Sequence, residues 1–263
     1  MTFRPKMGDL ASSNWGIRAR RVRPVEDPVV LCADAGARWH ASWLTALGLR
    51  SERDADAWRA VERPPLIYFA GVTLRPDVGA EAIAGVPGSI CDAWQTLDLA
   101  PGGFHVWRKE PWFYRAPGPL PDTTPPELEI VTVSTPEEVY EFEAVSVRGF
   151  GGEDDSVKPG TYHPPTVLSD HAMKMFIGRV DGQAVSAAMG YRTEGAVGVF
   201  GVTTVASARR RGYAAALTRA AMLTETSLPA ILAPSREAEG MYTRLGFEHV
   251  GELSIWVRGD PAP

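Results

Sequence analysis

The chain has 263 residues and a formal net charge of −5, and 44% of its residues are hydrophobic against 22% charged. These proportions are those of an ordinary folded, soluble protein, and the negative charge argues against a general nucleic-acid binder. No apolar run approaches the roughly 20 residues that a membrane span needs, and no apolar signal segment follows the N-terminal arginines. Cys32 and Cys91 form neither a metal-ligand spacing nor a disulfide framework, so we expect free thiols in the cytoplasm and no metal.

The first half opens with a basic stretch and then becomes globular. Residues 1–28 hold six Lys and Arg with little apolar periodicity, and we predict a flexible arm there. Beyond the arm, patterning and turn signals predict alternating helices and strands. The predicted elements are a strand at 29–31, a helix containing Trp39 and Trp43, a buried strand at 66–74, a partly helical segment at 79–97, and strand at 104–107 and 111–114 with a proline interruption.

The densest run of prolines separates the two halves. Proline at this density stiffens the backbone and removes the donors that a sheet needs, so we predict a linker at residues 121–126. After it, Thr135-Pro136-Glu137-Glu138 gives a helix a capping Thr, a Pro at its first position and a Glu three residues after the cap. The second half is predicted as a strand at 128–133, a helix to about 148, a loop at 149–165, a short helix at 166–173, strands at 174–180, 184–192 and 196–205, a helix at 209–226, a strand at 230–232, a helix at 237–245 and a strand at 249–257.

One stretch of the second half joins a strand to a helix through a basic turn. Residues 202–205 are rich in β-branched side chains, and an Ala-rich, helix-favouring segment follows Gly212. Between them lie three consecutive arginines. Exposed turn amides and a helix N-terminus both favour negative charge, so we predict an anion site here, of a kind that suits a pyrophosphate.

Two motifs in this region resemble a known family. Arg209-Arg210-Arg211-Gly212-Tyr213-Ala214 fits the Arg/Gln-x-x-Gly-x-Gly/Ala signature of the GNAT superfamily of acyl-CoA-dependent N-acetyltransferases. Residues 235–247 resemble that family's Asn-x-x-Ala-x-x-x-Tyr-x-x-x-Gly-Phe segment, with Ser235 in place of the usual Asn. The resemblance covers roughly residues 127–258, and the predicted order of elements there matches the GNAT order.

The resemblance implies that the chain binds acetyl-CoA as a co-substrate. In the family, the strand before the phosphate loop parts from its neighbour, and its free backbone groups pair with the pantetheine arm. Backbone amides of the following loop supply much of the phosphate contact, so single arginine replacements would weaken binding only modestly. The cofactor-binding residues implied in this way are Val202, Thr203, Thr204, Arg209, Arg210, Arg211, Gly212, Tyr213, Ala214 and Ser235.

The resemblance also places Tyr242 where the family has its general acid, next to the departing sulfur. The acceptor amine must lose a proton too, because an alkylamine with a pKa near ~10.4 is almost wholly protonated at pH 7. Residues 195–205 contain no ionisable side chain, which excludes a base on that strand. We predict Glu153 and Asp154 as the catalytic carboxylates, although an acidic loop is often simply solvated; the alternatives are Asp155, His163 and Glu194.

We therefore predict an α/β (α+β) GNAT fold, with a mixed, mostly antiparallel sheet flanked by helices. The catalytic domain is predicted at residues 127–260, and residues 29–120 as a degenerate GNAT-like lobe that lines the substrate side or forms a homodimer contact. The predicted activity is acetyl transfer from acetyl-CoA to the primary amine of a small molecule by direct attack, without a covalent enzyme intermediate. Two alternatives stay open: acetylation of a protein or peptide amine, and non-catalytic acyl-CoA binding as a sensor.

Overall fold

The computed structural model describes residues 27–120 and 124–259. The predicted flexible arm at residues 1–28 lies almost wholly outside the described residues, as do residues 121–123 of the predicted linker. The elements of the first half are α1 (Pro28–Ala46), β1 (Ser51–Arg53), β2 (Ala57–Ala60), β3 (Gly71–Thr73), the short 3-10 turn η1 (Ala80–Ala82), β4 (Ile90–Asp92), η2 (Ala100–Gly102) and β5 (Phe104–Arg115).

The second half follows the predicted order of strands and helices closely. Its helix α2 begins with the predicted capping box, because the Glu138 amide donates to the Thr135 hydroxyl and the Thr135 amide donates to the Glu138 carboxylate. The elements are β6 (Glu129–Thr132), α2 (Pro136–Phe150), η3 (Pro165–Ser169), β7 (Met173–Val180), β8 (Gln183–Arg192), β9 (Val197–Thr204), η4 (Ala206–Ala208), α3 (Tyr213–Met222), β10 (Ala230–Leu232), η5 (Arg236–Ala238), α4 (Glu239–Arg244) and β11 (Glu248–Arg258).

Several predictions for the first half were wrong. Residues 29–31 belong to α1 rather than to a strand, because the Asp27 carboxylate caps the Val29 amide at 2.9 Å and Pro28 occupies the first helical position. The predicted strand at 66–74 forms only at its end, and the segment at 79–97 contains a 3-10 turn and β4 instead of a longer helix. Residues 104–115 form one strand through Pro111.

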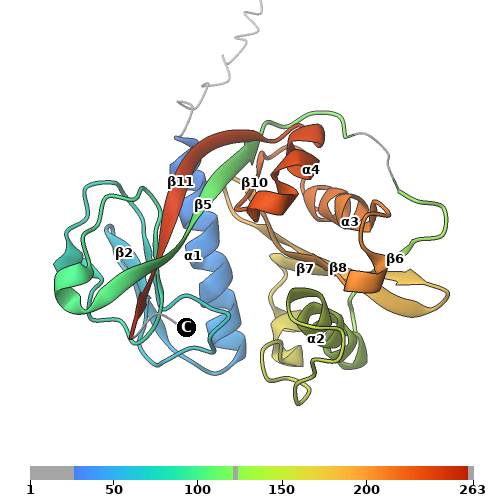
Figure 1. Cartoon of the computed structure of the whole chain (residues 1–263), viewed down its shortest axis with the longest axis horizontal. Helices are drawn as coiled ribbons and strands as arrows, with labels where there is room; N and C mark the ends of the chain where they lie inside the picture. The colour runs from blue at the N-terminus through green and yellow to red at the C-terminus, as the bar shows by residue number, and fades with distance from the viewer. Residues whose placement is uncertain (1–26, 121–123, 260–263) are drawn as a thin grey trace, which may run out of the picture.

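A single sheet runs through both halves of the described chain (Figure 1). It has 11 strands in the order β1-β2-β3-β4-β11-β5-β10-β9-β8-β7-β6. Strand β5, from the first half, lies between β10 and β11, from the second half, and pairs antiparallel with both. The first half therefore completes the sheet of the second. The linker predicted at residues 121–126 lies between β5 and β6, two strands of the same sheet.

The helices cover both faces of this sheet. In Figure 1, α3 and α4 lie above the sheet and α2 lies below it. Helix α1 lies on the face opposite α3, where Trp39 stacks on Phe200 of β9 with ring centroids 4.7 Å apart. The region beside β9 is thus bounded by elements from both halves of the chain.

Close packing of α3 on β8 gives a prediction about stability. A Cβ atom at Gly190 would lie 2.7 Å from the backbone oxygen of Ala221 in α3. Because a backbone atom cannot rotate away, Gly190→Ala is expected to lower the free energy of unfolding by about 1–3 kcal/mol. Gly36→Ala in α1 is the matched control, since a Cβ there meets nothing within 4 Å.

In urea unfolding, Gly36→Ala is expected to raise stability by up to about 1 kcal/mol, the helix propensity difference between the two residues. Equal unfolding midpoints for Gly190→Ala and the parent protein would show that α3 does not pack on β8 as described.

Candidate functional site

The connection between β9 and α3 exposes backbone amides. Arg210 and Gly212 both have left-handed backbones, with φ of +63° and +86°. Turns built from such residues direct successive N–H groups to one side and bind anions. Gly212 is also the N-cap of α3, and no side chain caps that helix end. The loop can therefore offer several amides and a helix N-terminus to a phosphate.

Two of the predicted phosphate-binding side chains are used within the protein. Arg209 donates through Nε to the Thr204 carbonyl at 3.0 Å and through Nη2 to the Gly149 carbonyl at 2.9 Å, which ties the loop to the end of α2. Tyr213 is buried, and its hydroxyl donates to Glu127 at 2.9 Å. Arg210 and Arg211 are exposed. The Arg209 and Tyr213 side chains are thus engaged within the protein, whereas Arg210 and Arg211 are open to solvent.

Strands β9 and β10 part next to this loop. Their parallel pairing joins only Val197 and Gly198 of β9 to β10, while β9 continues to Thr204. The predicted pantetheine-binding residues Val202, Thr203 and Thr204 all lie on the part of β9 beyond the pairing. A register shift opposite Ala187 and Met189 of β8 adds a bulge there. A chain-like ligand can add itself to such an unpaired strand edge through main-chain hydrogen bonds.

Tyr242 is a residue of α4, and its hydroxyl lies next to the Thr218 side chain of α3. Its ring packs edge-on against Phe247 with centroids 5.8 Å apart, and its side chain is 5% exposed. Burial raises the pKa of Tyr242 to about 12, although the neighbouring Thr218 side chain of α3 acts in the opposite direction. The phenol therefore keeps its proton at neutral pH. Ser235, the residue that departs from the family motif, is exposed and begins η5 just before α4.

The acidic loop lies beside the phosphate loop. Glu153 accepts a hydrogen bond from the Ser207 amide of η4 at 2.7 Å. The Ser207 hydroxyl and amide, together with Arg148 and Arg209, hold the pKa of Glu153 below its usual value. Asp155 accepts from the Gly152 amide at 2.8 Å. The lowered pKa makes Glu153 a weak base, and its hydrogen bond is to the turn at Ser207.

His163, an alternative base, lies in the core between the two halves. It is 5% exposed, lies edge-on to Trp43 and Phe142, and its Nδ1 has no hydrogen-bond partner among the described residues. Burial lowers the pKa of His163 to about 3. The backbone before it is fixed by Glu143, a buried carboxylate that accepts from three amides, those of Gly160, Tyr162 and His163. His163 is therefore a neutral packing residue in this structure.

Two buried histidines predict that the protein loses stability in acid. Burial lowers the pKa of His163 to about 3 and that of His40 to about 4, against 6.5 for a free histidine. Below pH 6.5 the unfolded chain binds protons that the folded chain does not, so the free energy of unfolding falls as the pH falls. At pH 5 each histidine is expected to cost on the order of 2 kcal/mol.

The measurement is urea unfolding at pH 7.5 and pH 5 for the parent protein and His163→Leu. The difference between the two pH values is expected to shrink by on the order of 2 kcal/mol in this variant. His171→Leu, at an exposed position, is the control and is expected to keep the full difference. An unchanged pH difference in His163→Leu would mean that His163 titrates normally in the folded protein.

A half-open cavity lies between α1 and η3 and has a volume of about 500 Å³. In it, the Ser42 hydroxyl donates to Asp170 at 2.6 Å. Burial and the Asp170 carboxylate raise the pKa of Tyr191 to about 12. The cavity is lined by Arg38, Ala41, Ser42, Thr45, Ala46, Thr166, Val167, Ser169, Asp170 and Tyr191.

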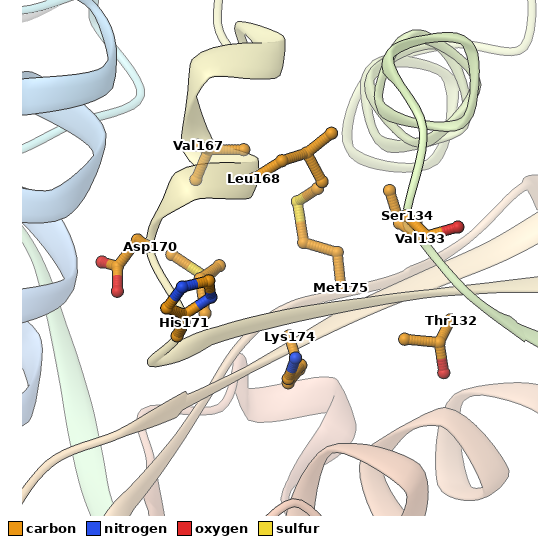
Figure 2. Close-up of a pocket in the computed structure, with 10 residues that line it drawn as sticks. Thr132, Val133, Ser134, Val167, Leu168, Asp170, His171, Lys174 and Met175 are labelled. Atoms are coloured by element: carbon orange, nitrogen blue, oxygen red, sulfur yellow. The ribbon is translucent and has the colours of Figure 1, made fainter.

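A smaller cavity of about 250 Å³ lies on the other side of η3, toward β6 and β7 (Figure 2). Val167, Leu168 and Met175 point into it, whereas the Asp170 carboxylate is turned away from it, toward α1. Residues 153–155 line neither cavity. The acidic side chain that the structure brings to a cavity is therefore Asp170, which the sequence did not single out.

The described residues contain no group of three His, Cys, Asp or Glu side chains placed to hold a metal ion. In residues 27–120 and 124–259, no helix combines the length and apolar character of a membrane span. Cys32 and Cys91 are buried free thiols.

Comparison with solved structures gives matches over most of the chain, although no protein-family model and no curated protein matches its sequence. A GCN5-related N-acetyltransferase from Kribbella flavida is 20% identical, with a TM-score of 0.56, and the match covers 87% of this chain and 96% of that one. A GCN5-related N-acetyltransferase-like protein from Streptococcus suis is 13% identical, with a TM-score of 0.51, and the match covers 86% and 98%. Since both matches extend well beyond the second half, the likeness includes the first half and its share of the sheet.

Proposed function

The chain has the fold of the GCN5-related N-acetyltransferases, and from this premise we propose that it is a cytoplasmic acyltransferase acting on acetyl-CoA and the primary amine of a small molecule. One observation carries the proposal: the amide-lined loop at Arg210–Gly212 directly follows the strand that parts from β10. An anion site joined to an open strand edge suits a ligand with a diphosphate at one end and an amide-containing arm at the other. The free thiols of Cys32 and Cys91 support a reducing compartment.

Acetyl-CoA supplies a thioester, which is an activated acetyl group. We assign its diphosphate to the amides of residues 210–214, where the helix N-terminus and the left-handed turn both favour negative charge. Its pantetheine arm is assigned to the open edge of β9 at Val202–Thr204. The bound arm would fix the direction of the thioester relative to the helices, so that the amine attacks it directly from the open side of the sheet.

Tyr242 is assigned as the hydrogen-bond donor to the leaving sulfur. A phenol with a pKa of about 12 keeps its proton at neutral pH and so can donate it. Complete proton transfer to a thiolate with a pKa near ~8.5 would be uphill by ~5 kcal/mol. We therefore propose that Tyr242 stabilises the negative charge that develops on sulfur by donating a hydrogen bond to it. The CoA thiolate then takes up its proton from solvent after the reaction.

The attacking amine must be neutral. Deprotonating an alkylamine at pH 7 costs on the order of 4.6 kcal/mol, which is small against the barrier of a typical enzymatic turnover. Glu153 is held on the Ser207 amide with a lowered pKa, and Asp154 is exposed in the same loop. We therefore propose that water carries the amine proton away, and that Glu153 and Asp154 are not required as bases.

A small-molecule acceptor is preferred over a protein because of the α1–η3 cavity. Its volume of about 500 Å³ lies within the range of roughly 300–1,000 Å³ found for small-molecule sites. Its lining residue Tyr191 of β8 pairs with Gly198 of β9, the strand assigned to the pantetheine arm.

The test is an assay of free CoA release from acetyl-CoA with a panel of aliphatic, aromatic and amino-alcohol amines. We expect at least one amine to raise release well above the rate without acceptor, with an acetylated product of the expected mass. Tight acetyl-CoA binding together with release at the no-enzyme rate for every amine would contradict the enzyme and favour a sensor.

A further inference from the structure

Three of the hydroxyl groups that line the α1–η3 cavity donate their protons to other groups of the protein. Thr166 donates to the Ala46 carbonyl at 2.6 Å, Ser169 donates to the Thr166 carbonyl at 2.8 Å, and Ser42 donates to Asp170 at 2.6 Å. A hydroxyl that donates its single proton still has lone pairs to offer. A ligand entering the cavity therefore meets hydrogen-bond acceptors from these three side chains.

Asp170 adds a carboxylate to this set of acceptors. One of its oxygens accepts from the Ala172 amide at 2.9 Å and the other from Ser42, and the Tyr191 hydroxyl also hydrogen-bonds to this carboxylate. A carboxylate has about four lone-pair sites, so it can still accept from a ligand. Its carboxylate points toward α1 (Figure 2).

The guanidinium of Arg38 at the same cavity is bound to Asp34 at 2.9 Å. Asp34 also pairs with Arg53, so Arg38 brings positive charge to this wall of the cavity. Asp170 and the three acceptor hydroxyls, on the η3 side and at Ser42, match a group that donates hydrogen bonds and carries positive charge, such as an ammonium.

The distance along β9 separates the cavity from the unpaired edge of that strand. Tyr191, in its wall, pairs with Gly198 of β9, and the unpaired part of β9 begins just after that residue. Two residues of strand, from Gly198 to Phe200, span about 7 Å. An ammonium on Asp170 would therefore lie too far from the thioester strand to be the reacting amine, but within reach of a second amine on the same short molecule.

We propose that the α1–η3 cavity binds a distal ammonium group of the acceptor, so that the preferred substrate is a diamine, with one amine held by Asp170 and the other acetylated beside β9. This inference rests on the acyltransferase function proposed above. It adds a substrate class and a specificity-determining residue to that function.

The experiment compares α,ω-diaminohexane with hexylamine, which has the same carbon chain and lacks the second amine. In the parent protein, kcat/KM for the diamine is expected to exceed that for hexylamine by roughly 10- to 100-fold, the worth of a charged hydrogen bond. In Asp170→Asn the ratio is expected to fall to about 1 through a higher KM for the diamine. Asparagine can still accept from the Ala172 amide, so the turn after η3 is retained.

Thr45→Lys is the second variant, because it places a cation at the exposed mouth of the cavity without altering Asp170. It is expected to abolish the diamine preference as well. Asp77→Asn, whose side chain is 75% exposed and pairs with Arg75, is the control and is expected to keep the preference. Titration of acetyl-CoA is expected to give equal affinities for all four proteins.

Equal kcat/KM for the two amines in the parent protein would overturn the proposal, and so would a diamine preference that survives Asp170→Asn. Both results leave the acyltransferase function standing, because acetylation still occurs. Absence of amine-dependent CoA release with either amine and with the wider panel would instead overturn the function itself, and this inference with it.

Discussion

Tyr242→Phe is expected to lower kcat by roughly 10²-fold while the affinity for acetyl-CoA stays within about twofold of the parent value. The phenylalanine ring keeps the edge-on packing on Phe247 and removes only the buried hydroxyl next to Thr218. The lost rate reflects the missing hydrogen bond to the sulfur as charge develops on it. Single-turnover kinetics with saturating acetyl-CoA measure the chemical step directly.

Tyr140→Phe is the control for this experiment, because it removes a tyrosine hydroxyl from the exposed side of α2. It is expected to keep the parent kcat. Poorer leaving thiols depend more on the donor, so acyl donors with more acidic thiols are expected to narrow the gap between Tyr242→Phe and the parent. A Tyr242→Phe enzyme with the parent rate would remove Tyr242 from the mechanism.

Gly212→Ala is expected to raise the dissociation constant of acetyl-CoA by roughly 10- to 100-fold. The residue has φ of +86°, which costs an alanine on the order of 1–2 kcal/mol, and a Cβ there would lie 3.4 Å from Pro125. The added methyl group also stands at the N-terminus of α3, where the amides are assigned to the diphosphate. Isothermal titration with acetyl-CoA measures the loss.

Gly182→Ala separates the effect on the ligand from the effect of backbone strain. Gly182, in the turn between β7 and β8, has φ of +77°, and a Cβ there meets nothing within 4 Å. Both variants are expected to lose similar stability, yet only Gly212→Ala is expected to lose acetyl-CoA affinity. Equal affinities in the two variants would mean that the loop at Gly212 does not bind the cofactor.

The second half could be predicted from sequence because its signals are local. The capping box at Thr135 and Glu138 and the turn at Asp181-Gly182 each specify a boundary without reference to distant residues. The predicted helix at 209–226 is longer than α3, because the left-handed backbone at Gly212 delays its start. The GNAT fold followed from these elements together with the two motifs.

The first half was harder because its structure depends on distant partners. Strand β5 pairs with β10 and β11, which lie more than 100 residues later in the chain. No local sequence pattern predicts that β5 is inserted between these two strands. Pro111 suggested an interruption of the strand. Strand β10 pairs only with Phe113–Arg115, so at Pro111 one edge of β5 pairs with β11 and the other edge has no strand beside it. A proline, which lacks an N–H, is tolerated at such a free edge.

In the candidate site, too, local features could be predicted and contacts between distant residues could not. The prediction of a phosphate-binding loop rests on the local spacing of Arg209 and Gly212, whereas the contact between Ser42 and Asp170 joins residues 128 apart in sequence. The choice of Glu153 came from its acidic loop and stays a prediction, to which the structure adds that this carboxylate accepts from the Ser207 amide. A run of acidic residues predicts that a loop is negatively charged, but it does not predict the element on which the loop packs.

The most direct measurement is a crystal structure of the protein with acetyl-CoA bound. We expect the diphosphate within hydrogen-bond distance of the amide nitrogens of residues 210–214, and the pantetheine arm alongside Val202–Thr204 in the gap between β9 and β10. Cofactor density at any other place on the chain, with this loop and this strand edge free of it, would contradict the assignment.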